Sequence, residues 1–324
     1  MKSNILVTGA IGFIGRSVID RLVNDKYRIT ALVRDKNKAR SLWGEKVTLI
    51  CGDVTDTHLI ETIPDDFSHI VHAAAAVSYR MPKKDEFYRV NVEGTKHILA
   101  VAAKQKCLTK FVYVSSVGVY GPIASPPADE TTPHNPVNDY EISKDRAEQS
   151  VINQSKNFPT VIIQPTLVYG PGDTASGMHG FFQAVLKGLF INIWGNKTQL
   201  HPCFIGNLID ALMLSLHTPV KSQTFIISDP KPYELPELVD LVKKTAGKIL
   251  FTPSIPLACM QMLGHMGNAV RSLGLPSPIS SDTVKFMIEH RAYDISKAQS
   301  LLNFSPCSTE HGIKQTLAYL RHAK

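Results

Sequence analysis

The sequence predicts an α/β protein with a doubly wound parallel sheet. A glycine-rich turn joins the first predicted strand to the first helix, and predicted strands and helices then alternate as far as Pro165. Parallel neighbours require long crossover connections, which this alternation supplies. The chain has 324 residues, of which 44% are hydrophobic and 19% charged, so it is long enough for one large α/β unit and a smaller companion.

The glycine-rich turn lies in the sequence Ile5–Gly15, I-L-V-T-G-A-I-G-F-I-G. Glycines at Gly9, Gly12 and Gly15 permit a tight turn, close approach of a pyrophosphate to the main chain, and packing of the helix on the strand. Free amides at the start of the helix favour an anion. The spacing differs from the common G-x-G-x-x-G, so a glycine turn without a ligand is the alternative to a dinucleotide site.

The remaining elements of the predicted sheet follow from hydrophobic periodicity. No internal repeat or low-complexity tract interrupts them. The expected strands are 29–33, 47–51, 70–75, 110–115 and 160–165. One expected helix ends near 43, a second begins near 57, and two more span 84–104 and 138–156, with a proline-rich loop expected at 121–136.

The end of the second strand carries information about the cofactor. Dinucleotide folds that select an unphosphorylated ribose place Asp or Glu about twenty residues beyond the glycines. Here Val33 occupies that place and Arg34 follows. A guanidinium can bind a 2′-phosphate, which a carboxylate would repel, so NADP(H) is the expected cofactor with NAD(H) as the alternative. The opposing interpretation of Arg34 is a solvated surface residue beside Asp35.

Candidate catalytic residues lie in the sequence Tyr140-Glu-Ile-Ser-Lys144. Residues four apart share one face of a helix, so the phenol and the ammonium can meet the same ligand. A fixed cation favours phenolate and brings proton exchange by tyrosine within reach. The preceding strand ends at Ser115-Ser116, which places hydroxyls at the carboxyl edge of the sheet, where α/β ligands bind. For Ser115 alone, a plain strand-end hydroxyl is the better interpretation.

These residues belong to an ordered set of short motifs that resembles the extended short-chain dehydrogenases/reductases, the NAD-dependent epimerase/dehydratase family. Within it, the 3β-hydroxysteroid dehydrogenase and dihydroflavonol reductase branch is most similar. The resemblance is close from Lys2 to about Gly172 and looser beyond. The motifs are Thr8–Gly15, Gly52–Asp56, His72–Ala75, Asn91–Thr95, Ser115–Ser116, Tyr120–Gly121, Tyr140-x-x-x-Lys144 and Gln164–Gly172.

The resemblance implies a role for each matching position. Tyr140 would be the catalytic acid/base, Lys144 would lower its pKa and bind the nicotinamide ribose, and Ser116 would hold the substrate oxygen. Asn91 would be the structural or proton-relay asparagine. Gln164 departs from the Arg that many relatives carry there. The cofactor would contact Thr8, Gly9, Gly12, Phe13, Ile14, Gly15, Arg34, Asp53, Val54, Ala73, Ala74, Ala75, Ser115, Tyr140, Lys144, Pro165 and Val168.

The resemblance also implies a Rossmann-type sheet with a smaller, discontinuous C-terminal substrate domain. Residues 1–170 would form the NADP-binding domain, to which 201–228 return, and 171–200 with 229–324 would mainly form the substrate domain. Family members commonly dimerise through the two helices expected at 84–104 and 138–156. We therefore expect a homodimer.

Composition limits the other functional classes. The net charge is +7, but the cations are scattered, so we do not expect nucleic-acid binding. Five widely spaced cysteines predict neither a metal site nor a disulfide framework. The chain passes from Met1-Lys2 directly into a strand without the pattern of a signal peptide, so a cytoplasmic location is expected.

Two features bear on the substrate. Nucleotide-sugar relatives usually carry an Arg just before the strand that begins here near Cys203, whereas this chain has His201 or a close neighbour there, a poor substitute for a bidentate guanidinium. The Met-rich segment Ile255–Leu275 carries too many polar residues to span a membrane. It is a packing helix, an apolar lid or a membrane-surface helix.

The predicted function is an NADP-dependent oxidoreductase that acts on the hydroxyl/carbonyl pair of a small apolar, hydroxysteroid-like or dihydroflavonol-like substrate. A nucleotide-sugar epimerase or dehydratase is the enzymatic alternative. A non-catalytic NADP-sensing protein is the alternative of a different class, but it would be expected to lose Ser116, Tyr140 and Lys144, and all three are present.

Overall fold

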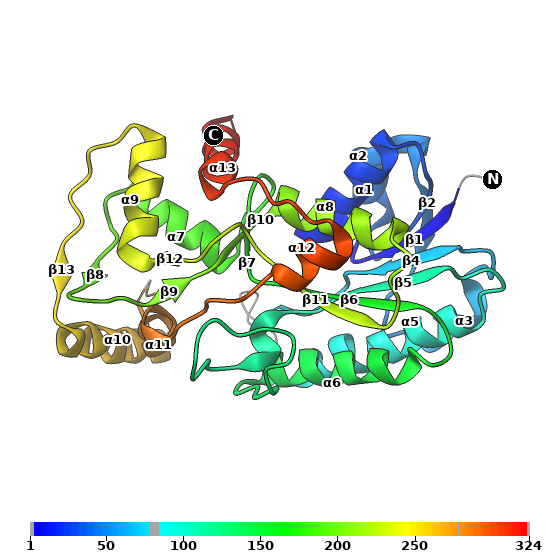
Figure 1. Ribbon diagram of the computed structural model, residues 1–324, viewed down its shortest axis with the longest axis horizontal. Coiled ribbons are helices and arrows are strands. Elements are labelled where there is room, and N and C mark those ends of the chain that lie inside the picture. Colours follow the sequence, from blue (N-terminus) through cyan, green and yellow to red (C-terminus); the bar gives the residue numbers. More distant parts are fainter. Residues whose placement is uncertain (1–2, 78–83, 276, 278, 323–324) are drawn as a thin grey trace.

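The computed structural model describes residues 3–77, 84–275, 277 and 279–322. Its centre is a seven-stranded, fully parallel sheet, which confirms the predicted fold class (Figure 1). The strand order reverses at β1, as in a doubly wound Rossmann-type sheet. In spatial order the strands are β11 (Gln223–Ile227), β6 (Thr160–Pro165), β5 (Lys110–Val114), β4 (His69–His72), β1 (Asn4–Thr8), β2 (Arg28–Val33) and β3 (Thr48–Cys51).

Helices cover both faces of the sheet, and each face has its own apolar core (Figure 1). Central strands such as β1 and β5 are buried along their whole length, as expected for a sheet covered on both sides. One layer contains α1 (Phe13–Asn24), α2 (Lys36–Trp43), α8 (Ile205–His217) and α12 (Ser296–Leu302), and the other contains α3 (Leu59–Thr62), α4 (Lys84–Phe87), α5 (Gly94–Ala103) and α6 (Asp139–Gln154).

Three predicted elements differ from the observed ones. The helix expected from about Thr57 is a single turn, because the chain becomes extended at Ile63, directly before Pro64. The strand expected to reach Ala75 ends at His72, and the backbone of Ala73 that follows it packs against Gly9. The long helix expected over 84–104 contains a π-helical segment, η3 (Tyr88–Glu93), between α4 and α5.

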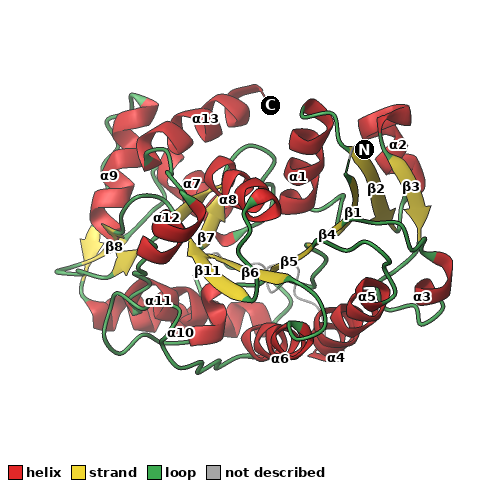
Figure 2. Cartoon of the chain, turned by 45° about the vertical axis from the view of Figure 1, so that its right-hand side comes forward, coloured by secondary structure: helices red, strands yellow, loops and turns green. Residues whose placement is uncertain are grey.

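The second part of the chain assembles beyond the carboxyl edge of the sheet (Figure 2). It consists of short strand pairs covered by helices. The strands are β7 (Leu167–Tyr169), β8 (Asn192–Ile193), β9 (Gln199–Leu200), β10 (Pro202–Phe204), β12 (Tyr233–Glu234) and β13 (Ser254–Ile255), and the helices are α7 (Gly177–Leu186), α9 (Leu235–Ala246), α10 (Leu257–Ser272), α11 (Ser281–Ile288) and α13 (Thr309–His322). The 3₁₀ turns η1 (Gly44–Lys46) and η4 (Val117–Tyr120) belong to the first part, after α2 and β5.

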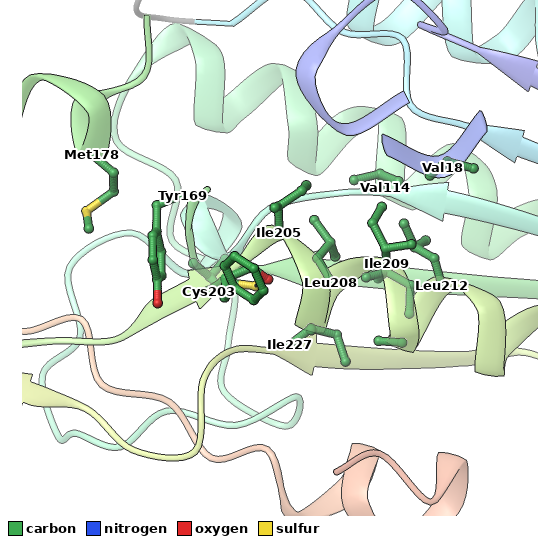
Figure 3. Packing of buried hydrophobic residues seen from close by; sticks show 14 of the residues in the cluster. Val18, Val114, Tyr169, Met178, Cys203, Ile205, Leu208, Ile209, Leu212 and Ile227 are labelled. Atoms are coloured by element: carbon green, nitrogen blue, oxygen red, sulfur yellow. The ribbon is translucent and has the colours of Figure 1, made fainter. Parts of the chain in front are cut away.

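One core connects the sheet to this second part. Figure 3 shows Leu208, Ile209 and Leu212 of α8 between the sheet layer and the side chains of Tyr169 and Met178. α8 packs on α1, and the chain then returns to the sheet as β11 beside β6. The second part is therefore anchored to the carboxyl edge of the sheet, where α/β proteins bind their ligands. The exact domain boundaries stay a prediction.

Candidate functional site

The glycine turn has the geometry that a phosphate cradle requires. Gly9 has φ +69°, and a Cβ there would lie 2.6 Å from the backbone of Ala73. A Cβ on Gly15 would lie 2.2 Å from the carbonyl oxygen of Gly9, so α1 can pack this closely only on glycine. Gly12 caps α1 without a side-chain hydrogen bond, which leaves the first amides of the helix to a ligand.

A buried hydrogen-bond chain holds the strand ends beside this turn. Thr8 Oγ1 bonds His72 Nδ1 at 2.6 Å, and His72 Nε2 bonds Thr95 Oγ1 at 2.9 Å. Burial lowers the pKa of His72 to about 3, so the ring is neutral at physiological pH. Thr8 Oγ1 also accepts from the amide of Ala74 at 3.3 Å. The predicted cofactor residues Thr8, Ala73 and Ala74 therefore lie together against the turn.

At the carboxyl ends of β2 and β3, Arg34 faces Asp53. Arg34 Nη1 lies 3.6 Å from Asp53 Oδ2, while the Arg34 side chain is 71% exposed. The high exposure of Arg34 also agrees with the alternative interpretation of a solvated surface residue. Asp35 beside it caps α2 by accepting from the amide of Lys38 at 2.9 Å. Burial raises the pKa of Asp53, but hydrogen bonds from Thr55 and the charge of Arg34 outweigh this and lower it overall.

Tyr140 and Lys144 occupy the first turns of α6, directly beside the end of β5. Asn138 begins the helix by accepting from the amide of Glu141 at 3.0 Å. Lys144 is almost completely buried; its Nζ donates to the carbonyl oxygen of Val114 at 2.7 Å and lies 4.3 Å from the centre of the Tyr113 ring. Burial lowers the pKa of Lys144 to about 7, and the charge of Glu148 opposes this shift. Tyr140 is half-buried, with its ring 5.9 Å from that of Phe87.

Asn91 ties the π-helical segment η3 to α6. Its Nδ2 donates to Ser143 Oγ at 2.8 Å, and its Oδ1 accepts from the amide of Ala76 at 2.7 Å. Ser143 in turn donates to the carbonyl oxygen of Tyr140 at 2.7 Å. A π-helical turn often marks a functional position in a helix, because it re-aims one side chain. Here it aims Asn91 at the backbone that carries Tyr140.

The two serines at the end of β5 point to different partners. Ser115 donates to the carboxylate of Glu148 and is buried. Ser116 accepts from the amide of Gly118 at 3.1 Å, which orients its Oγ and leaves the hydroxyl hydrogen available to a ligand oxygen. The geometry thus favours Ser116 over Ser115 as the residue that would contact the substrate.

Sequence reasoning missed a buried polar network behind these serines. Gln164, which is completely buried, donates from Nε2 to both carboxylate oxygens of Glu148 at 2.9 and 3.1 Å. Its Oε1 accepts from the hydroxyl of Tyr120 at 2.6 Å. Burial raises the pKa of Glu148, while the hydrogen bonds from Ser115 and Gln164 oppose this. Glu148 follows Lys144 by four residues, the spacing that put Tyr140 and Lys144 on one face, and that spacing could have identified it.

His201 has a structural environment. The ring is 1% exposed; its Nε2 lies 2.8 Å from both the carbonyl oxygen of Asp229 and the hydroxyl of Ser228, and its Nδ1 accepts from the amide of Tyr293 at 3.3 Å. Burial lowers its pKa to about 4. Both ring nitrogens are engaged, so His201 does not offer a cation or a donor to a ligand.

The remaining predicted cofactor residues lie along the same edge of the sheet. Pro165 is the last residue of β6, and Val168 lies in β7 directly beyond it. Phe13 and Ile14 begin α1, and Val54 follows β3. Three features therefore lie along one edge of the sheet: the glycine turn, the Arg34–Asp53 pair, and the group of Ser116, Tyr140 and Lys144. This arrangement can hold an extended dinucleotide and place a proton donor beside a reacting carbon–oxygen bond.

Known proteins are similar to this chain over most of its length. Residues 5–228 match the NAD dependent epimerase/dehydratase family. The chain is 29% identical to the UDP-glucose 4-epimerase of Vibrio cholerae over 98% of this chain and 95% of that protein. It is 27% identical to the decarboxylating sterol-4-alpha-carboxylate 3-dehydrogenase of Candida albicans over 98% of this chain and 97% of that protein.

A solved structure agrees with the fold. The Bordetella bronchiseptica enzyme WbmG, in complex with NAD and UDP, superposes with a TM-score of 0.80 and 20% identity, covering 100% of this chain and 96% of that one. At this identity the likeness shows the fold alone.

Proposed function

The chain belongs to the NAD dependent epimerase/dehydratase family of extended short-chain dehydrogenases/reductases, enzymes that act on CH–OH groups, and on that premise we propose that it is an NADP-dependent oxidoreductase of an apolar alcohol or ketone. The observation that carries the proposal is the placement of Tyr140 and buried Lys144 on α6, beside the end of β5 and its Ser116 hydroxyl.

The proposed chemistry assigns a proton step to these residues. A bound nicotinamide cofactor supplies or takes up the hydride. In the reducing direction, Tyr140 gives its phenolic proton to the carbonyl oxygen, and the Ser116 hydroxyl donates a hydrogen bond to the same oxygen. The ammonium of Lys144 lies on the same face of α6 and favours the phenolate that remains. Asn91 positions Tyr140 through Ser143.

The residues present fit a dinucleotide. A Cβ on Gly9 or Gly15 would close the turn, and the uncapped start of α1 leaves amides for the pyrophosphate. We assign the NADP preference to Arg34, whose exposed guanidinium can turn to a 2′-phosphate at the end of β2. Asp53 competes for that guanidinium, so the preference is expected to be moderate.

The environment of His201 supports an apolar substrate. Nucleotide-sugar relatives use an Arg near this position to hold a diphosphate, whereas His201 is buried, neutral and engaged by Asp229, Ser228 and Tyr293. The alternative is a nucleotide-sugar epimerase, which the name of the Vibrio cholerae relative favours.

A substrate panel tests the proposal. Ketosteroids and dihydroflavonols are offered with NADPH, UDP- and GDP-sugars are offered beside them, and cofactor oxidation is followed by absorbance. We expect oxidation of NADPH with at least one apolar ketone. Calorimetry on the same panel provides the opposing outcome: micromolar binding of a nucleotide sugar, with no binding of the apolar compounds, would overturn the proposed substrate class.

A homodimer and a cytoplasmic location remain predictions. Packing of α5 and α6 against the same helices of a second copy would give a four-helix bundle. Light scattering at micromolar concentration should then give twice the 35.7 kDa mass of the chain. A mass near 35.7 kDa would contradict the dimer.

A further inference from the structure

Exposed apolar side chains are concentrated at one end of the molecule. Among the residues that the structure describes, all eight large apolar side chains that are more than half exposed lie between residues 189 and 275. Ile249 and Phe251 are 105% and 84% exposed. A soluble domain rarely gathers its most exposed apolar side chains in one region without a binding function. We call this region the apolar end; it comprises 189–194 and 249–275.

Helix α10 presents its apolar side chains outward because small residues dock its other face. A Cβ on Gly267 would lie 1.8 Å from the carbonyl oxygen of Ile279, so only glycine allows the observed contact with the segment leading to α11. Asn268 fixes the pair by donating from Nδ2 to Ser281 Oγ at 2.9 Å. Met262, Met266 and Leu273 lie away from this contact and are exposed. The Met-rich helix therefore packs through Met260, Gly264 and Gly267, while Met262 and Met266 stay exposed.

Two loops extend this surface beyond α10. The parallel pair β8 and β13 joins them, and the amide of Trp194 donates to the carbonyl oxygen of Ile255 at 2.8 Å, beside the start of α10. The Lys248 ammonium donates to the carbonyl oxygen of Leu186 at 2.9 Å, which brings the loop of Ile249 and Phe251 to that of Leu189. Figure 1 shows α10, β8 and β13 together at one end of the molecule, and Figure 2 shows β8 and α10 on the side opposite β3.

Cations outnumber carboxylates around this end. The chain from 174 to 209 and from 241 to 281, which includes the apolar end, contains no Asp or Glu, and Asp240 and Asp282 flank the second of these segments. Lys243 is paired with Asp240 at 2.7 Å, just outside the second segment. The remaining cations of the two segments are all exposed: Lys187, Lys197, Lys244, Lys248 and Arg271.

We propose that the apolar end docks on the surface of an anionic phospholipid bilayer. Apolar side chains on an amphipathic helix, with Trp194 beside them, match the depth profile of a membrane interface. Exposed cations in stretches of chain without Asp or Glu complement anionic headgroups. Within the described ranges, no helix has the length and apolar character needed to cross a bilayer, so the proposed contact is a surface contact. The proposal is independent of the reaction assigned above.

Vesicle binding of the full chain tests the proposal. Vesicles of phosphatidylcholine alone and of equimolar phosphatidylcholine and phosphatidylglycerol are mixed with the protein and sedimented. We expect binding to the anionic vesicles only, weakened by salt, with a blue shift of tryptophan emission. Trp194 is the expected reporter, because the other tryptophan, Trp43, is buried in α2.

Matched variants locate the surface. Lys244→Gln with Lys248→Gln should weaken binding about fivefold per cation, whereas Lys156→Gln with Lys314→Gln should leave it unchanged. Met262→Gln with Met266→Gln keeps helix propensity and should weaken binding roughly tenfold or more. Leu301→Gln, an exposed apolar residue of α12, is its control, and circular dichroism checks that each variant folds.

Three outcomes would overturn the proposal. The first is no binding to anionic vesicles, and the second is equal binding of the surface variants and their controls. The third is self-assembly without vesicle binding: light scattering shows a concentration-dependent assembly of the unmutated chain, and the double variant Met262→Gln with Met266→Gln abolishes it. That result would assign the apolar end to a second copy of the chain.

Discussion

The carboxyl edge of the sheet and the apolar end differ in how their side chains are held. At the edge, Lys144, Asn91 and Ser116 each have a hydrogen-bond partner that fixes their orientation. At the apolar end, Met262, Phe251 and Trp194 are each more than half exposed. The difference indicates that the edge is preorganised for chemistry, which needs precise geometry, whereas the end suits a partner that tolerates imprecise contact.

Replacing Tyr140 by Phe should give the largest effect and would test the edge. The substitution keeps the ring and its contact with Phe87 but removes the proton donor, so kcat should fall by roughly 100-fold or more. Cofactor affinity, measured by fluorescence titration, should change little. Tyr319→Phe removes a phenol from α13 and is the matched control. Near-normal turnover of Tyr140→Phe would contradict the assignment of Tyr140 as the proton donor.

Replacing Lys144 by Ala should distinguish its two expected roles from the single role of Tyr140. Because Lys144 is placed to support the phenolate and to hold the cofactor ribose, both kcat and cofactor affinity should fall. Folding is checked by thermal unfolding, since the substitution also leaves a cavity beside Tyr113. A loss of kcat without any loss of cofactor affinity would contradict the ribose contact.

Replacing Arg34 by Ala should give a smaller, selective effect. If the guanidinium binds the 2′-phosphate, NADPH should bind more tightly than NADH by about 1.5 to 3 kcal/mol, and Arg34→Ala should remove most of that difference. Arg28→Ala removes an exposed cation from the other end of the same strand and should leave the difference intact. Equal affinities of the unmutated protein for the two cofactors would refute the assignment.

Replacing His201 by Gln should give the smallest effect, a change in the pH dependence of stability. Burial lowers the pKa of His201 from 6.5 to about 4, so the unfolded chain binds a proton between these values that the folded chain does not. The stabilising contribution is complete above pH 6.5 and is lost as pH falls towards 4. Urea unfolding at several pH values should show a slope shallower by up to about 1.4 kcal/mol per pH unit in the variant. Equal slopes would show that His201 titrates normally.

The sheet and the edge could be predicted from the sequence because their determinants are local. Gly9, Gly12 and Gly15 specify one turn, and Tyr140 and Lys144 share a helix face by spacing alone. The place of Glu148 on the face of Lys144 could have been predicted from spacing, but its contact with Gln164 could not, because it joins a strand to a helix and depends on packing. The exposure of Met262 and Met266 was likewise unpredictable, since the same spacing describes a core helix. It is Gly267, by docking α10 from its opposite face, that turns them outward.

Isotope transfer tests the central claim most directly. NADPH that carries deuterium at the transferable position of the nicotinamide is incubated with the protein and with an apolar ketone that the protein reduces. We expect one deuterium on the carbinol carbon for each NADP⁺ formed. In Tyr140→Phe, both deuterium transfer and NADP⁺ formation should be lost. Conversion of a nucleotide sugar to its epimer without net oxidation of NADPH, together with no deuterium in any apolar product, would contradict this claim.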